Sequence, residues 1–306
     1  MHAVVDTSIQ GRLSSDKFAA WCVLLPAGCL VAMETCGGAH HWARKLRHFG
    51  LDVRLIAGHF VTPYRMTGKG GKNDANDAAA ICEAASRPHM RFVPVKTPTQ
   101  QALLAIHRLR EGYKQDRTAC INRIRGLLTE FGIVFAQSPE ALYLGLADVL
   151  EDASNELPGI VRLALQEARL HWIELECHIA SCDERITAHV RSDEQAKAAA
   201  QIAGIGPVTA SALVATVGDF TQFKSGAQFG SWLGLVPRQN SSGGKTQLGS
   251  ITKRGDDYLR MLLIQGAKSA VMTAHKRSDQ ISQWLVQLIA RVGWLPYKDE
   301  MFEMAT

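Results

Sequence analysis

The chain has 306 residues, of which 46% are hydrophobic and 21% are charged. This length allows two or three domains, and this balance excludes a fully disordered chain. No apolar run approaches the roughly 18 to 20 residues that a membrane-spanning helix needs, and residues 1–10 lack the basic start and apolar stretch of a signal peptide. We therefore expect a folded cytoplasmic protein with no membrane segment.

The net charge of +5 hides an uneven distribution along the chain. Residues 131–195 carry 12 Asp or Glu against 4 Lys or Arg, whereas residues 1–95 carry 11 basic residues against 7 acidic ones and residues 196–306 carry 12 against 7. The basic ends are compatible with a polyanionic partner. The seven cysteines include no C-x-x-C pair, which indicates reduced thiols rather than a zinc site or a disulfide framework.

The first third of the chain alternates between strand and helix patterns. The predicted strands cover residues 2–5, 9–13, 29–33 and 52–56. The predicted helices cover residues 15–25, 39–49 and 74–86, and a glycine- and lysine-rich loop at 65–73 precedes the last of them. This alternation predicts an α/β layer fold.

Two long stretches, residues 97–131 and 158–191, have apolar residues at three- and four-residue spacing and are predicted to be helices. With a loop at 132–157 they would form a hairpin or coiled-coil arm. The alternative is two ordinary helices that pack on the domains either side. The remaining predicted elements are a helix at 209–217, an apolar segment at 229–235, a loop at 236–255 and a helix at 256–274.

Three carboxylates are candidates for a metal site. Glu34 follows an apolar strand, and strand ends open onto the crevice where α/β sheets bind ligands. Asp74 and Asp77 lie three residues apart at the start of a predicted helix, so both project from one face. Such an oxygen-only set suits Mg²⁺ or Mn²⁺. The alternative for the two Asp residues is stabilisation of the helix dipole.

A serine-containing loop is the candidate for nucleophilic chemistry. Ser241 and Ser242 stand before two glycines, which give access to a hydroxyl group. Four neighbouring basic residues would stabilise the charge of a reacting phosphate, namely Arg238, Lys245, Lys253 and Arg254. The alternative is a flexible surface loop.

A glycine-containing turn is a second candidate for phosphate binding. Gly204 and Gly206 precede a predicted helix and resemble the turn of a helix-hairpin-helix element, whose backbone N–H groups approach a phosphate. Such a contact is independent of DNA sequence. The alternative is a plain turn between helices.

The combination of motifs resembles the transposases of the 110/1111 group of bacterial insertion sequences. The matching segments keep the order of that family from about residue 2 to residue 285. They are Met33–Trp42, Lys72–Ala78, Arg91–Lys96, Ile205–Ala210, Trp232–Lys245 and Ile251–Gly255.

The resemblance implies three domains: a ribonuclease-H-like (RuvC-like) domain with a DEDD carboxylate set at 1–95, a helical arm at 96–195, and a mostly α-helical serine-bearing domain at 196–306. It implies that Glu34 is the second acid of the set and that Asp74 and Asp77 are the third and fourth, which bind Mg²⁺ or Mn²⁺. It also implies that Ser242 is the nucleophile, with Ser241 as the fallback.

The resemblance further implies a reaction and its partners. Serine attack on a DNA phosphodiester gives a covalent phosphoserine, followed by strand exchange and religation. A structured guide RNA made from the element bridges donor and target DNA by base pairing, and the protein recognises its shape and backbone. A nucleoid-associated homodimer or homotetramer is expected, because composite sites take acids and serine from different protomers.

Two departures from the family pattern shape the expectations. The first strand of the type Gly-Ile-Asp is absent, so the N-terminal domain is expected to lack that strand and its acid, as in a truncated and impaired copy. Residues 287–306 do not resemble the closing helix of the family. Two alternative functions stay open: a metal-dependent, structure-selective DNA endonuclease that uses the carboxylates alone, and a non-enzymatic DNA-binding remnant.

Overall fold

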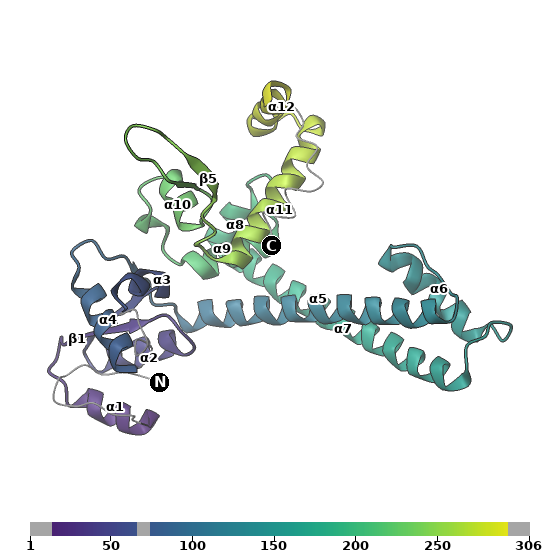
Figure 1. Cartoon of the computed structure of the whole chain (residues 1–306), viewed down its shortest axis with the longest axis horizontal. Coiled ribbons are helices and arrows are strands. Elements are labelled where there is room, and N and C mark those ends of the chain that lie inside the picture. The colour runs from purple at the N-terminus through teal and green to yellow at the C-terminus, as the bar shows by residue number, and fades with distance from the viewer. Residues whose placement is uncertain (1–13, 66–73, 293–306) are drawn as a thin grey trace. The chain divides into compact units, whose positions relative to one another are not determined.

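The computed structural model describes residues 14–65 and 74–292. These residues are mostly helical with a small sheet (Figure 1). The chain divides into two compact units, residues 1–98 and 99–306. The strands predicted at 2–5 and 9–13 lie outside the described residues.

The first unit is built on a three-stranded sheet in the order β1-β2-β3. Strands β1 and β2 are parallel, with Glu34 opposite Ile56, and β3 is antiparallel to β2, with Phe92 opposite Ile56. This sheet, with its helices, confirms the predicted α/β character. The elements are α1 (Ser15–Val23), β1 (Leu30–Glu34), α2 (Ala39–His48), β2 (Asp52–Ile56), α3 (Gly58–Val61), η1 (Thr62–Tyr64), α4 (Asp74–Ser86) and β3 (Phe92–Val93).

Hydrophobic clusters form on both faces of this sheet. Val53 and Leu55 point to one face, where they pack with α1 and α2, and Ile56 points to the other, where it packs with Ala80 and Ala84 of α4. Alternate residues of a strand point to opposite faces, which explains this division. Helices therefore cover both faces of the sheet, and the carboxyl ends of β1 and β2 lie at its edge.

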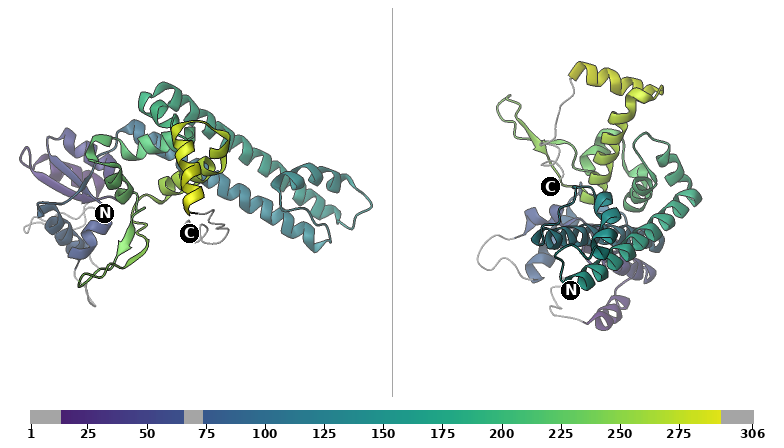
Figure 2. Two further views of the ribbon diagram at one scale, coloured as in Figure 1. Left: turned by 90° about the horizontal axis from the view of Figure 1, so that it is seen from above. Right: turned by 90° about the vertical axis from the view of Figure 1, so that its right-hand side faces the viewer.

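The second unit begins with two long helices, α5 (Pro98–Glu130) and α7 (Gly159–Ser192), which run side by side (Figures 1 and 2). Both confirm the predicted helical stretches. An ion pair joins Arg110 to Asp183 with 2.5 Å between nitrogen and oxygen, and a second joins Arg117 to Glu176 at 3.3 Å.

The predicted loop at 132–157 is wrong, because a third helix, α6 (Pro139–Glu151), lies within it. The Ser138 side chain caps this helix by accepting hydrogen bonds from the Glu140 and Ala141 amides. Leu142 and Leu146, four residues apart, are fully buried in the cluster formed with α5 and α7. Tertiary burial of one face thus stabilises this helix.

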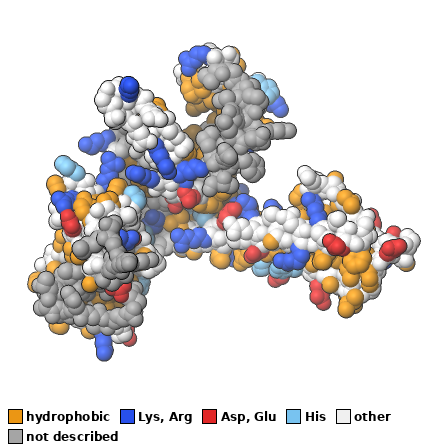
Figure 3. All heavy atoms as spheres, in the orientation of Figure 1, with side chains coloured by type: hydrophobic (Ala, Val, Ile, Leu, Met, Phe, Trp, Pro, Cys, Tyr) orange, Lys and Arg blue, Asp and Glu red, His pale blue; other side chains and the backbone are white. Residues whose placement is uncertain are grey.

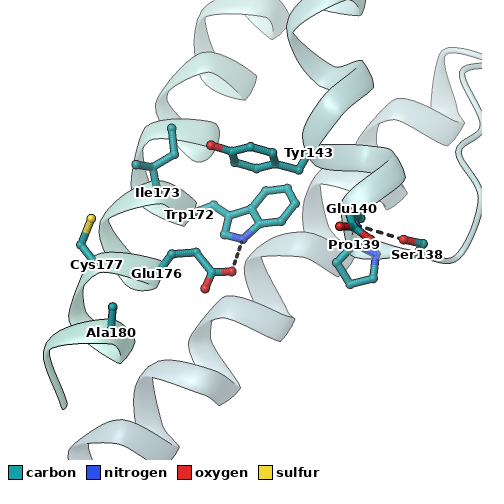
Figure 4. Close-up of a pocket in the computed structure, with 9 residues that line it drawn as sticks. All are labelled: Ser138, Pro139, Glu140, Tyr143, Trp172, Ile173, Glu176, Cys177 and Ala180. Atoms are coloured by element: carbon teal, nitrogen blue, oxygen red, sulfur yellow. Dashed lines mark hydrogen bonds between the residues drawn. The ribbon is translucent and has the colours of Figure 1, made fainter. Parts of the chain in front are cut away.

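A groove of about 720 Å³ lies between α6 and α7 (Figure 4). The edge of the Tyr143 ring meets the Trp172 ring with centroids 5.4 Å apart, and the Trp172 indole donates to Glu176 at 3.1 Å. None of the predicted site residues lines this groove, so it is separate from the candidate catalytic residues.

The C-terminal part of the second unit packs around α9 (Pro207–Val217), which is buried on almost every side. The predicted loop at 236–255 is wrong, because β4 (Pro237–Gln239) and β5 (Leu248–Ile251) pair there as an antiparallel hairpin. Helix α12 was not predicted. The other elements are α8 (Glu194–Ala200), η2 (Phe220–Gln222), α10 (Gly226–Trp232), α11 (Asp257–Thr273), η3 (Ala274–Lys276) and α12 (Gln280–Val292).

A buried histidine joins α5 to this C-terminal part. The two ring nitrogens of His107 lie 3.1 Å from the hydroxyl groups of Ser211 in α9 and Tyr258 in α11. Burial lowers the pKa of His107 to about 4 and raises that of Tyr258 to about 12, so both groups are neutral at pH 7. Within the described ranges, no helix combines the length and hydropathy that crossing a bilayer requires.

Candidate catalytic residues

Glu34 is the last residue of β1 and lies at the carboxyl edge of the parallel strand pair. Just beyond the same end of β2, the chain turns into α3 at Gly58. A Cβ atom at Gly58 would collide with the carboxylate of Glu34. The glycine therefore leaves the space that the Glu34 side chain occupies.

Glu34 and Asp77 meet at one guanidinium group, that of Arg65. Arg65 Nη2 donates to Glu34 Oε2 at 2.8 Å, and Arg65 Nε lies 3.0 Å from Asp77 Oδ1. The second contact is an ion pair without hydrogen-bond geometry, and the buried Nε has no hydrogen-bond partner. The structure thus brings two of the three predicted carboxylates together around a shared positive charge.

Asp74 opens α4 and is exposed, one turn before Asp77. In residues 14–65 and 74–292, no three potential ligands lie close enough together to hold a metal ion. Glu34 and Asp77 nevertheless fit a hard divalent cation in their chemistry, because both are carboxylates and both already face one cationic group.

Arg65 was not among the predicted site residues. It lies at the start of the glycine- and lysine-rich loop, which also contains Lys69 and Lys72. The sequence contains no signal that separates this arginine from the other basic residues, because its role depends on which acids the fold brings to it.

The two candidate serines lie near the tip of the β4–β5 hairpin. Ser242 and Lys245 flank a two-residue turn, and the Lys245 amide donates to the Ser242 carbonyl at 3.1 Å. Gly243 and Gly244 have φ values of +57° and +78°. A hairpin turn of this kind requires positive φ at both central positions, which glycine adopts without strain.

The two serine hydroxyl groups differ in their partners. The Ser241 Oγ accepts from Gln239 Nε2 at 3.0 Å and from the Gln247 amide at 3.4 Å. Across the described part of the chain, no hydrogen bond to the exposed Ser242 hydroxyl is present. The Ser242 hydroxyl is therefore the one open to an incoming group.

The base of the hairpin is fixed by backbone contacts between the segments 232–235 and 251–255. The Lys253 amide donates to the Gly234 carbonyl at 3.0 Å, and Lys253 itself has a φ of +52°. A Cβ atom at Gly234 would collide with the backbone of Arg254. The buried Arg260 of α11 donates to the Leu233 carbonyl at 2.9 Å, so α11 supports the same base.

Basic side chains lie along this hairpin and around its base in Figure 3. Arg238, Lys245 and Arg254 are exposed, and Lys253 is half-buried. Three of the four predicted cations are thus exposed, Arg238 and Lys245 on the hairpin that carries the serines and Arg254 at its base.

The two glycines of the predicted phosphate-binding turn lie in different surroundings. Gly204 has a φ of +85°, and a Cβ atom there would collide with the Gly266 carbonyl of α11. Gly206 is the exposed N-cap of α9 and has no side-chain cap. Gly204 therefore serves the packing of α11, and Gly206 is the glycine whose surroundings are open.

Two family models match the chain: a DEDD-type transposase domain of the IS110 group over residues 12–133, and the transposase IS116/IS110/IS902 family over residues 196–283. A probable family 20 transposase of Pseudomonas aeruginosa is 49% identical, over 86% of this chain and 77% of the relative. The transposase for insertion sequence element IS1328 of Yersinia enterocolitica is 39% identical, over 93% of this chain and 87% of the relative. The transposase for insertion sequence element IS1111A of Coxiella burnetii is 38% identical, over 92% of this chain and 76% of the relative. The chain therefore belongs to the IS116/IS110/IS902 family of insertion-sequence transposases.

Proposed function

We propose that this transposase cuts and rejoins DNA through a covalent intermediate on Ser242. The observation that carries the proposal is the exposed Ser242 hydroxyl, which has no hydrogen bond among the described residues. The adjacent Ser241 hydroxyl, by contrast, accepts two hydrogen bonds. A nucleophile must reach phosphorus along an open path, and the tip of a hairpin provides one.

The proposed step transfers a phosphoryl group. Ser242 Oγ attacks the phosphorus of a phosphodiester and releases its proton to solvent, a new Oγ–P bond forms, and the bond from phosphorus to one deoxyribose oxygen breaks. The departing oxygen takes up a proton and leaves as a hydroxyl group. Attack of a hydroxyl from another strand on the phosphoserine reverses these steps and rejoins DNA. Arg238, Lys245 and Arg254 would stabilise the negative charge on the phosphate oxygens.

The carboxylates are proposed to form a second centre in a ribonuclease-H-like first domain. Glu34 and Asp77, which already meet at Arg65, would hold Mg²⁺ or Mn²⁺, and Asp74, which lies outside that pair, would have to approach them to act as a third ligand. When bound, such an ion supplies positive charge that polarises a phosphate oxygen. Gly58 keeps Glu34 in place by leaving room for its carboxylate.

The proposed partners are DNA and a structured guide RNA, bound by a homodimer or homotetramer. Support comes from the basic balance of residues 1–95 and 196–306 and from the motifs shared with the 110/1111 group. The backbone of the nucleic acid would be contacted by Gly204, Gly206, Arg238, Lys245, Lys253 and Arg254, of which Gly206 and the three exposed cations are the most open.

Matched serine variants test this proposal. Purified full-length protein is incubated with supercoiled donor and target DNA, Mg²⁺ and RNA transcribed from the element, and both recombinant junctions and protein–DNA adducts are measured. Ser242→Ala is expected to abolish both products, and Ser241→Ala to retain both.

The alternatives give different outcomes in the same experiment. Mg²⁺-dependent cleavage that survives Ser242→Ala would favour a nuclease that uses the carboxylates alone. Salt-sensitive binding of DNA without adduct or cleavage, by the wild type and by both variants, would favour a non-enzymatic DNA-binding protein.

A further inference from the structure

We propose that Arg65 is an internal counter-ion that holds Glu34 and Asp77 together and competes with the divalent cation for their oxygens. The inference rests on the metal-binding role proposed above for these two carboxylates. It adds a positioning residue, because Arg65 would act through the acids and not on DNA.

The guanidinium group of Arg65 lies between the two carboxylates. Its two contacts, 2.8 Å to Glu34 Oε2 and 3.0 Å to Asp77 Oδ1, reach one carboxylate from the strand edge and one from α4. A planar guanidinium group can donate to two acceptors at once in a fixed geometry, whereas the ammonium group of a lysine is a compact point charge. Without a cation between them, the two carboxylates would repel each other.

The hydrogen bonding of this guanidinium group is incomplete. Its Nε is buried and lacks a hydrogen bond although it lies next to Asp77. A buried donor without a partner has lost water and has gained no hydrogen bond in return. Arg65 therefore neutralises the charge of the two acids without satisfying all of its own hydrogen-bond donors. A metal ion, which needs no donor hydrogen aimed at each oxygen, can compete with it for the carboxylate oxygens.

The Arg65 side chain is partly exposed and has room to move away from the acids. The side chains of Arg65, Glu34 and Asp77 are 36%, 28% and 33% exposed. The Arg65 amide donates to the Thr62 carbonyl at 3.2 Å, and the adjacent Tyr64 ring lies under the Arg87 guanidinium at 5.3 Å. The backbone is thus held beside the acids while about a third of the side-chain surface is open to solvent.

Competition follows from the shared oxygens. Glu34 Oε2 cannot accept a short hydrogen bond from Arg65 and also coordinate Mg²⁺ or Mn²⁺ through the same lone pair, because the ion must approach to about 2.1 Å. An ion that takes these lone pairs therefore displaces the guanidinium group, and the two positive charges also repel each other. Loss of Arg65 should strengthen metal binding and destabilise the metal-free protein.

The test measures binding of Mn²⁺ alone to the full-length protein by isothermal titration calorimetry. Arg65→Ala is expected to bind Mn²⁺ about three- to tenfold more tightly than the wild type, the size expected for removing two partly exposed ion pairs. Arg65→Lys should give an intermediate affinity. Arg54→Ala is the matched control, because Arg54 has a similar exposure but pairs with Asp52 at 2.8 Å and should leave Mn²⁺ affinity unchanged.

Thermal midpoints separate this role from a merely structural one. Arg65→Ala should lower the midpoint in EDTA, and saturating Mn²⁺ should remove most of the difference from the wild type. If Arg65 were purely structural, Arg65→Ala would lower the thermal midpoint by the same amount with and without Mn²⁺. That result would overturn the inference. An unchanged or weaker Mn²⁺ affinity of Arg65→Ala would overturn it as well.

Two acid variants separate failure of this inference from failure of the proposed function. If Glu34→Gln and Asp77→Asn lose Mn²⁺ binding while Arg65→Ala behaves as the wild type, only the counter-ion role fails. If Mn²⁺ binding survives both acid variants, or if no variant and no wild-type protein binds Mn²⁺, the metal-binding role of these acids fails together with the counter-ion role.

Discussion

The carboxylate edge of the first unit and the serine hairpin of the second place their reactive groups by different physical means. At the carboxylate edge, ion pairs with Arg65 and the space beside Gly58 position the side chains of Glu34 and Asp77. In the serine hairpin, backbone conformation positions Ser242, through glycines of positive φ at the tip and at the base.

This difference predicts how each region tolerates change. Contacts between side-chain ends can rearrange at low cost, whereas a backbone held against another backbone cannot. We therefore expect substitutions at the carboxylate edge to alter ligand binding more than stability, and substitutions at the base of the hairpin to alter stability first.

The largest effect is expected from Gly234→Ala at the base of the hairpin. The new Cβ would collide with the Arg254 backbone, and Gly234 has a φ of +75°. We expect a loss of about 3 kcal/mol in the free energy of unfolding, measured by urea denaturation followed by circular dichroism. Gly230→Ala, which meets open space in α10, should stay within about 0.5 kcal/mol of the wild type. Equal losses would contradict the backbone role.

A second effect concerns the buried His107, which anchors α5 to α9 and α11. Its pKa in the folded protein is about 4, below the ordinary value of 6.5, so the unfolded chain takes up a proton first as the pH falls. The contribution to stability is present above pH 6.5 and is lost as the pH falls towards 4. Between pH 7 and pH 5 we expect a loss on the order of 2 kcal/mol.

The measurement for this effect is the slope of unfolding free energy against pH. His107→Gln should flatten the slope between pH 7 and pH 5 whatever its own stability. A slope that His107→Gln does not alter would contradict the pKa of this residue.

At the carboxylate edge, Gly58→Ala is expected to change stability by less than about 1 kcal/mol. The new Cβ meets the end of the Glu34 side chain, which can move aside. The displaced carboxylate should weaken Mn²⁺ binding about fivefold, measured by calorimetry. Gly37→Ala has open space around it and serves as the control. A loss of stability as large as that of Gly234→Ala would remove the distinction between the two regions.

The smallest effect is expected from Lys245→Ala near the hairpin tip. Removal of this exposed positive charge should weaken DNA binding a few-fold and reduce the slope of log affinity against log salt concentration by about 1. Lys224→Ala, an exposed lysine outside the hairpin, should change neither quantity. Fluorescence anisotropy with labelled DNA over a range of salt concentrations measures both quantities. Equal effects of the two variants would contradict a role of the hairpin in DNA binding.

Elements with strong local signals were predicted well. The strand at 52–56 and the helix at 74–86 agree with β2 and α4 to the residue, and the two long helical stretches agree with α5 and α7 within one residue at each end. Periodic apolar residues and clear stop signals carry that information locally. The two-residue β3 and the helix α6 were missed because partners distant in sequence stabilise them.

The sequence by itself determined the family, the long helices, and the order of Glu34, Asp74, Asp77 and the serine pair along the chain, because motifs and hydrophobic periods are local properties. Only the tertiary structure decided that Arg65 joins Glu34 to Asp77. It also decided that Gly204 faces Gly266 and that the Ser241 hydroxyl is occupied while that of Ser242 is open. These features depend on distances between segments that lie far apart in the sequence or on the register of a hairpin, and no local pattern encodes them.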